Sequence, residues 1–395
     1  MKNFKLHSII FFLSAFILNS CTETYPLLTN TYEEALVVET TITNELKNQE
    51  IKLVKTARFE DKVYLPENGA EVYITDDSGN RYDFEDQSDR YVSTVAFQAA
   101  PGIQYQLHIN TKDGRSFESS AETLTPVNPM QSVTAEIETI DTERGVSIRA
   151  RSFDPDNKSK FYRYVYEETY KVLTPKWVDT KAVVGDDGFI KFIPNSPDTK
   201  VCYGSKKSST LLLTDTNGLS EDKINYLVRF ISDQDYIIST RYSILVKQYV
   251  ESLAAYNYYS TLKKMSGTEN ILSPKQPGIV LGNIRSIKNS GDKIIGYFDV
   301  ASVSTERIYF NYAELFYGEV LPPYYTDCQE YCYDDYPNNP DPCTHSPSGL
   351  LDDITLNKVR YFFNWEIPLL GKLTLRRLHH DSLEHKTNIL DRLKS

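Results

Sequence analysis

The sequence predicts a mainly β protein of two domains: an N-terminal immunoglobulin-like sandwich, followed by a larger β domain with one inserted helix. Two observations lead to this fold class. Short apolar or β-branched runs recur along the chain between turn sequences, as is typical of antiparallel strands. Tyrosine, which favours strands, occurs 29 times, against two Trp and three Met. The 395 residues are enough for two or three domains with cores of their own.

The first 20 residues have the parts of a bacterial lipoprotein signal peptide. Lys2 and Lys5 supply positive charge, residues 9–18 form an apolar run too short to span a bilayer, and Leu-Asn-Ser precedes Cys21. This ending resembles a lipobox, which implies that Cys21 is lipidated and becomes the mature N-terminus. The alternative is an ordinary cleaved signal with a chance cysteine. We therefore expect an exported protein in which residues 21–30 form a lipidated tether.

The remaining chain is expected to reach the outer membrane through lipid alone. No later segment approaches the roughly 20 consecutive apolar residues of a spanning helix. The formal net charge of −11 disfavours nucleic acid as a partner, because phosphate binding needs a basic patch. The tether has a single acidic residue, Glu23, so the sequence leaves open whether the protein faces the cell surface or the periplasm.

Residues 31–126 are predicted to form the immunoglobulin-like sandwich. About seven strand-like runs follow one another over roughly ninety residues, a density typical of such sandwiches. Asp-Asp-Ser-Gly-Asn at 76–80 and Lys-Asp-Gly-Arg at 112–115 are typical hairpin turns. Thr-Pro-Val-Asn-Pro at 125–129 indicates a linker, since closely spaced prolines interrupt both helices and strand ladders.

Residues 130–345 are predicted to form the larger β domain. Within a strand at 161–172, Tyr162, Tyr164 and Tyr166 share one face. This face is either a cross-strand packing surface or a weak binding platform for a sugar or a protein.

A helix is predicted near residues 251–266 of the same domain. Its apolar stripe comprises Leu253, Tyr256, Tyr259 or Ser260, and Leu262 or Lys263. The helix is expected to stop near Ser266-Gly267 and to pack against the β domain, although an exposed docking helix is the alternative.

Four cysteines besides Cys21 are candidates for disulfides: Cys202, Cys328, Cys332 and Cys343. An even number in an exported chain predicts two disulfides, for which three connectivities exist. A metal site and unpaired thiols are the alternatives. The spacing lacks the paired CxxC knuckles of a structural zinc site.

Several ordered segments resemble one known family. CYGSKKSSTLLLTDTNGLSEDKI begins at Cys202, QPGIVLGNIRS at Gln276 and IIGYFDVASVSTERIYF at Ile294, and they follow GAEVYITDDSGN and PGIQYQLHINTKDGRSF. These segments resemble a Bacteroidota family of outer-membrane lipoproteins known only as a domain of unknown function, family 4249, over roughly residues 21–345. Members are often encoded beside TonB-dependent receptors. The resemblance therefore implies an accessory role in uptake or surface assembly, with no established reaction.

Residues 346–395 form an atypical C-terminal tail. Family members usually end soon after a Cys-Thr pair, which is present here as Cys343-Thr344. The following residues do not continue the family pattern. The tail is either an extension private to this chain or the product of a misread coding frame.

The sequence contains no recognised catalytic motif. A GxSxG elbow, a P-loop and a GxGxxG turn are all missing. His379, His380 and His385 do not have the spacing of HExxH or HxxEH, and His108 lies in a predicted strand with no evident nucleophile beside it. The acidic stretch 330–341 lacks the DxDxDG spacing of a calcium loop. We therefore predict no catalytic residues, no cofactor and no metal.

Together these features predict a non-enzymatic outer-membrane lipoprotein, the accessory or substrate-binding subunit of a TonB-dependent β-barrel receptor. One alternative is a surface adhesin or scaffold. Another is a glycan- or peptide-directed hydrolase, which would need a metal or two carboxylates about 5–10 Å apart in a concave pocket.

Overall fold

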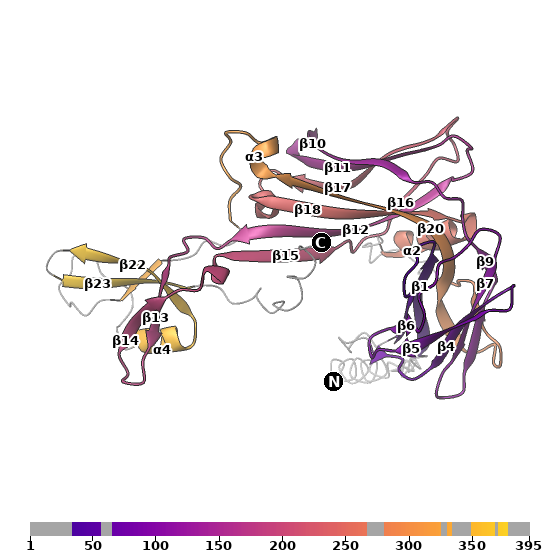
Figure 1. The fold of residues 1–395 in the computed structure, drawn as a ribbon, viewed down its shortest axis with the longest axis horizontal. Coiled ribbons are helices and arrows are strands. Elements are labelled where there is room, and N and C mark those ends of the chain that lie inside the picture. Colours follow the sequence, from indigo (N-terminus) through magenta and orange to yellow (C-terminus); the bar gives the residue numbers. More distant parts are fainter. Residues whose placement is uncertain are drawn as a thin grey trace, which may run out of the picture.

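The computed structural model describes residues 34–56, 65–266, 280–324, 330–333, 349–367 and 370–377. Most of these residues lie in strands, which confirms the predicted mainly β fold class. The strands build two adjacent units, and a small arm projects from the far end of the second one (Figure 1). The predicted signal peptide at 1–20 and tether at 21–30 lie outside the described residues. Within the described ranges, no helix has the length and apolar character needed to cross a membrane.

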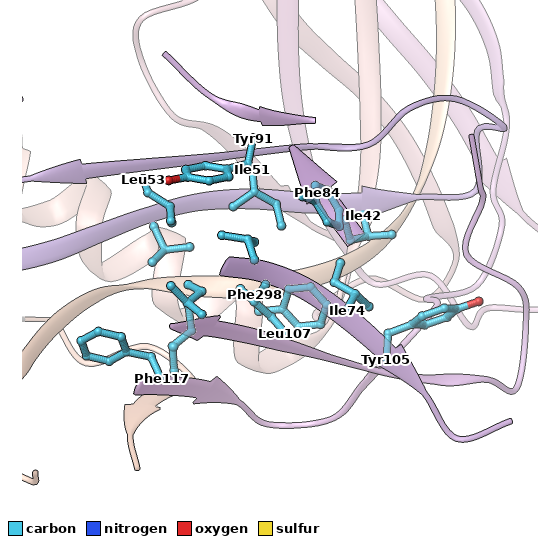
Figure 2. Close-up of a cluster of buried hydrophobic side chains, with 14 of the residues drawn as sticks. Ile42, Ile51, Leu53, Ile74, Phe84, Tyr91, Tyr105, Leu107, Phe117 and Phe298 are labelled. Atoms are coloured by element: carbon cyan, nitrogen blue, oxygen red, sulfur yellow. The ribbon is translucent and has the colours of Figure 1, made fainter. Parts of the chain in front are cut away.

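The N-terminal unit forms around a single apolar core. Its strands are β1 (Ala35–Thr43), β2 (Glu50–Lys55), β3 (Leu65–Pro66), β4 (Glu71–Asp76), β5 (Arg81–Asp86), β6 (Tyr91–Ser93), β7 (Gln104–Asn110), β8 (Ser116–Ser119) and β9 (Glu122–Thr123). Alternate side chains of β7 are buried, the pattern of a strand with one face on a core. Figure 2 shows this core, in which Ile74 and Leu107 meet Phe298 from much later in the chain.

Both predicted hairpin turns of this unit are present. The turn at 76–80 joins β4 to β5, and Asp76 Oδ1 accepts hydrogen bonds from the backbone N–H groups of Ser78 and Asn80, at 3.0 and 2.9 Å. The turn at 112–115 joins β7 to β8. Such Asx-type bonds explain why Asp at the start of a turn predicts a hairpin.

The N-terminal unit extends beyond the predicted boundary at residue 126. β19 (Ile284–Ser286) pairs with β8, and the first half of β20 (Lys293–Asn311) pairs in parallel with β1. A parallel partner cannot come from a tight hairpin, because parallel pairing needs a long crossover connection. The predicted range 31–126 was therefore too short: the unit is completed by strands from residues 284–301.

The second unit packs a small sheet against a larger one. The small sheet consists of β10 (Met130–Ile140), β11 (Glu143–Asp154) and β17 (Asp222–Ser232). The facing strands are β12 (Phe161–Leu173), β15 (Val201–Lys207), β16 (Leu212–Asp215), β18 (Arg241–Glu251) and the second half of β20. The short helices η2 (Tyr236–Ile238) and α3 (Tyr312–Leu315) lie at one end of this unit. Side chains of both layers, such as Ile148 and Ile244, form its core.

The predicted helix is present as α2 (Leu253–Ser266). Ala255 and Tyr258 are buried against Tyr297 of β20, whereas Leu253 is 57% exposed. The apolar stripe thus starts two residues later than predicted. Tyr256 contacts the second unit instead, with its ring 5.0 Å from that of Phe161. The helix therefore packs where the two units meet, with Ala255 and Tyr258 on the half of β20 that completes the N-terminal unit and Tyr256 on the second unit.

The arm contains part of the predicted tail. It consists of β13 (Thr180–Val184), β14 (Ile190–Pro194), η1 (Pro197–Thr199), β21 (Glu330–Tyr333), α4 (Leu350–Thr355), β22 (Val359–Ile367) and β23 (Leu370–Arg377). Leu350 and Ile354 of α4 are buried against Ala182 and Val184 of β13. In the described part of 346–395, α4 and Tyr361 of β22 therefore pack against the hairpin.

β20 is the strand that both units share. Residues 293–301 pair with β1, and residues 302–311 pair antiparallel with β18. Gly296 makes the close approach possible: its φ is +153°, and a Cβ atom there would lie 2.5 Å from the carbonyl oxygen of Val38. Any larger residue would push β20 away from β1.

We expect Gly296→Ala to lower the free energy of unfolding by about 2 kcal/mol, because it adds both backbone strain and a clash with Val38. Urea unfolding of the mature chain measures this. Gly218→Ala is the matched control, since a Cβ atom at Gly218 meets nothing within 4 Å. Equal stability of the two variants would contradict the role assigned to Gly296.

Candidate functional site

The tyrosine face of β12 is packed inside the second unit. Tyr162, Tyr164 and Tyr166 are 0%, 1% and 9% exposed. The Tyr162 hydroxyl lies 2.8 Å from Asp222 Oδ1, and the Tyr164 ring stacks on Tyr226 at a centroid distance of 4.9 Å. These three side chains therefore belong to the core between the two sheets and are not exposed as a binding platform.

The same face of β12 continues beyond the core to a cavity. Because alternate residues share a face, Glu168 and Tyr170 come next after Tyr166. Both line a cavity of about 440 Å³ at the end of the second unit. We call this cavity the Glu168 pocket; its described lining is Glu168, Tyr170, Lys206, Arg229, Gln234, Asp235, Tyr236, Ile237, Pro323 and Tyr324.

Glu168 is only 1% exposed and uses one of its two carboxylate oxygens within the protein. Oε2 accepts a hydrogen bond from the Tyr242 hydroxyl at 2.6 Å and lies 3.2 Å from Arg229 Nε. Oε1 is buried and has no hydrogen-bond partner among the described residues. A buried acceptor without a partner costs roughly 1–3 kcal/mol. The pocket wall thus contains an acceptor whose bonding capacity is unused.

Arg229 is the charged partner of Glu168. Although burial opposes ionisation of the guanidinium, the negative Glu168 raises the pKa of Arg229 above its ordinary value. Burial also raises the pKa of Tyr242, with a further contribution from Glu168, so this tyrosine remains a hydrogen-bond donor. Arg229 and Tyr242 therefore both remain hydrogen-bond donors beside Glu168 at neutral pH.

Three tyrosines form the aromatic part of the pocket. The Tyr236 and Tyr324 rings are stacked with centroids 6.0 Å apart, and Tyr170 meets Tyr236 edge-on, also at 6.0 Å. Tyr236 begins η2, and the preceding N-cap residue Asp235 accepts a hydrogen bond from the Ile237 N–H at 3.1 Å. This local cap fixes the turn that presents Tyr236 to the cavity.

A second polar cluster lies where the two units meet. Arg163 Nε of β12 is 2.6 Å from Glu251 Oε1 of β18, and its Nη2 is 3.7 Å from Asp299 Oδ2 of β20. The guanidinium also donates to Thr41 of β1 at 3.2 Å and lies 4.6 Å from the ring centroid of Tyr259 of α2. One cation therefore connects four strands and the helix.

The acids of this cluster are sealed from solvent. Glu251 and Asp299 are 3% and 2% exposed. Burial, the neighbouring negative charge of Glu251 and a hydrogen bond with it raise the pKa of Asp299 well above its usual range, against the opposing effect of Arg163. A protonated Asp299 leaves Arg163 and Glu251 as a neutral pair. Glu251 and Asp299 thus bind Arg163 at the junction between the units and are inaccessible to a substrate.

Of the predicted cysteine sites, the structure describes the side chain of Cys202 alone. Cys202 lies on β15 as a free, half-buried thiol within the described chain. Cys21, Cys328 and Cys343 lie outside the described residues, and only the backbone of Cys332 is described, in β21. The disulfides and the lipidation of Cys21 therefore remain predictions. In the part of the chain that the structure covers, no three His, Cys, Asp or Glu side chains are grouped to hold a metal.

His108 is part of the N-terminal sandwich. Its ring stacks on Tyr73 at 4.7 Å, and its Nε2 lies 3.0 Å from Thr75 Oγ1. Burial lowers its pKa, so it is neutral at physiological pH. The tail histidines at 379, 380 and 385 lie outside the described residues.

The arm has a cavity of its own, of about 390 Å³, between the β13–β14 hairpin and α4. Trp177 lines it and donates a hydrogen bond to Thr199 Oγ1 at 2.9 Å. The hairpin also exposes apolar side chains, with Phe189 73% and Phe192 45% exposed. Exposed apolar groups on a projecting hairpin are typical of a protein-contact surface.

A family model described as a domain of unknown function (DUF4249) matches residues 22–307. The chain belongs to this family. The predicted resemblance to family 4249 is therefore confirmed. A search of curated proteins finds no match. The matched region contains the Arg163 cluster and most of the Glu168 pocket, whereas Pro323 and Tyr324 follow it.

One local signal in the sequence points to Glu168. Glu168 continues the two-residue period of Tyr162, Tyr164 and Tyr166, so it is an acid on an otherwise aromatic face. No comparable local signal connects it with Arg229, which lies on the opposite sheet.

We expect Arg163→Met to lower the free energy of unfolding by about 3–5 kcal/mol, because it leaves buried acids without their cation. Urea unfolding measures the effect. The control is Arg151→Met, whose pair with Glu136 is solvent-exposed and contributes less than about 1 kcal/mol. Similar losses in both variants would show that the junction does not depend on Arg163.

Asp299→Asn should remove a pH dependence of stability. The raised pKa means that folded Asp299 keeps its proton where the unfolded chain, with an ordinary value of 3.8, has released it. Stability of the wild type relative to Asp299→Asn should therefore fall as the pH rises above about 4, until the folded pKa is passed. Urea unfolding at several pH values between 4 and 8 measures this. Parallel stability curves would contradict the raised pKa.

Proposed function

We propose that the chain is a lipid-anchored, non-enzymatic binding subunit of the outer membrane that works with a TonB-dependent β-barrel receptor. The observation that carries the binding role is the Glu168 pocket, a cavity with an aromatic wall and an unused buried acceptor. The membrane anchor rests on the lipobox resemblance at Cys21. The receptor partnership rests on the family resemblance.

The bonding of the pocket acids favours binding over hydrolysis. Glu168 and Asp235 both line the pocket, but Glu168 is paired with Arg229 and Asp235 caps η2. A hydrolase of the two-carboxylate type needs one acid to donate a proton and the other to attack or to activate water. Carboxylates committed to an ion pair and a helix cap are poorly suited to either role.

The arm is the surface that we assign to the receptor. Its β13–β14 hairpin projects from the second unit and exposes Phe189, Phe192 and Ile193 (Figure 1). Aromatic residues are enriched at protein interfaces, where their large area is buried at low entropic cost. β12 runs toward the arm (Figure 1), and Glu168 and Tyr170 near the end of this strand line the pocket, so a receptor held by the arm would lie on the pocket's side of the second unit.

We expect the tagged, lipidated protein, extracted in detergent from the outer membrane of its own host, to bring down a TonB-dependent β-barrel receptor identified by mass spectrometry. Phe189→Ser combined with Phe192→Ser should reduce receptor recovery at least about tenfold, since a tenfold change needs only 1.4 kcal/mol. The matched control is Leu219→Ser, an equally simple loss of an exposed apolar side chain elsewhere on the second unit.

A second variant tests the lipid anchor independently of the receptor partnership. Cys21→Ser should move the protein out of the membrane fraction, because attachment depends on the lipid. Membrane retention of Cys21→Ser would contradict the anchor. Repeated extraction of the lipidated wild type without any β-barrel receptor would contradict the partnership.

A further inference from the structure

We infer that the Glu168 pocket binds a neutral, hydroxyl-rich ligand of the saccharide class. This inference rests on the proposed binding role and specifies the chemistry of what is bound. It is carried by three properties of the pocket: its balanced charge, its unused acceptor and its aromatic wall.

The charges of the pocket favour a neutral ligand. Among the described lining residues, Glu168 and Asp235 are negative, and Lys206 and Arg229 are positive. An anionic ligand would meet the unpaired Oε1 of Glu168, and a cationic ligand would meet Arg229 and Lys206. Like charges at close range are unfavourable, so the balanced set selects against both kinds of ion.

The hydrogen-bonding groups favour a ligand that both donates and accepts. Glu168 Oε1 needs a donor, and a bond to a carboxylate contributes roughly 1.5–3 kcal/mol. Arg229 bonds Glu168 through Nε and the Phe230 carbonyl oxygen through Nη1, at 3.2 and 3.1 Å. A guanidinium carries five N–H donors, so Arg229 retains donors for a ligand. A hydroxyl group suits this set because it donates to Glu168 and accepts from Arg229 or Lys206.

The tyrosines favour a ligand that also has an apolar face. Tyr170, Tyr236 and Tyr324 supply ring surface beside the charged groups. A pyranose ring combines hydroxyl groups at its rim with C–H groups on its face, so it matches both parts of the wall. A purely apolar ligand would bury Glu168 Oε1 without a partner, which is unfavourable. The volume of about 440 Å³ lies in the usual range for small-molecule sites.

Calorimetry and saturation-transfer NMR on the mature chain test this inference. The probes are the neutral trisaccharides maltotriose, xylotriose, laminaritriose and chitotriose, with a neutral glycan array for wider coverage. Trigalacturonate represents acidic sugars, chitosan trimer represents cationic sugars and trialanine represents peptides. We expect at least one neutral glycan to bind and the other three probes to bind at least about tenfold more weakly, a difference of 1.4 kcal/mol.

Variants assign any binding to this pocket. Glu168→Gln replaces the free acceptor by a donor with little change in size, and Tyr236→Ala removes one ring. Each variant should lower the affinity for the bound glycan at least about tenfold, because it loses one charged hydrogen bond or one aromatic contact. Tyr317→Ala is the matched control, because Tyr317 is 91% exposed and does not line the pocket. Thermal unfolding of each variant checks that the fold is retained.

Two results would overturn the inference: no neutral glycan binds, or binding is unchanged in both Glu168→Gln and Tyr236→Ala. A preference for trigalacturonate, chitosan trimer or trialanine would overturn the neutral-saccharide assignment as well. These outcomes are distinct from failure of the proposed function. If the receptor is recovered but no glycan binds, the saccharide inference fails and the accessory role stands. If a glycan binds but no receptor is recovered, only the proposed receptor partnership fails.

Discussion

The pairing of β20 with both β1 and β18 is the constraint on which the rest of the structure depends. Its first half closes the N-terminal unit in parallel with β1, and its second half continues the large sheet of the second unit. More than two hundred residues separate β1 from β20, so neither unit is complete until the chain has returned. Phe298 illustrates the result, since it is a core residue of the first unit supplied by a strand of the second (Figure 2).

The Arg163 cluster lies where β20 passes from one unit to the other. Asp299 immediately follows Phe298, and Glu251 ends the strand that β20 joins next. A buried ion pair contributes little net stability compared with apolar packing, but removing one partner is strongly unfavourable. The cluster therefore acts mainly to define one arrangement of β1, β12, β18 and β20. That arrangement in turn sets where the far end of β12, with its pocket, lies relative to the N-terminal unit.

Local patterns in the sequence predicted the local parts of this fold. Alternating apolar residues and Asx turns predicted the hairpins of the first unit, and helical periodicity predicted α2 within two residues of its start. The parallel pairing of β1 with β20 left no such signal, because it joins segments whose register depends on the whole intervening chain. The two-residue alternation of a strand likewise predicted that Tyr162, Tyr164 and Tyr166 share one face. It could not show that a second sheet covers this face.

The tyrosine face of β12 is core at its first three positions, Tyr162, Tyr164 and Tyr166, and pocket wall at the next two. The first of these two wall residues is Glu168, an acid whose burial is unfavourable unless its oxygens are bonded. Arg229 and Tyr242 satisfy one oxygen, and the other has no hydrogen-bond partner among the described residues, although Glu168 lines the cavity. A residue that only stabilised the sheet would be better apolar, as most of its neighbours in the core are. Local departures from folding rules are concentrated at functional sites. The unsatisfied oxygen gains its meaning from the cavity and the tyrosines beside it, and together they are the physical reason to look for a ligand at this end of β12.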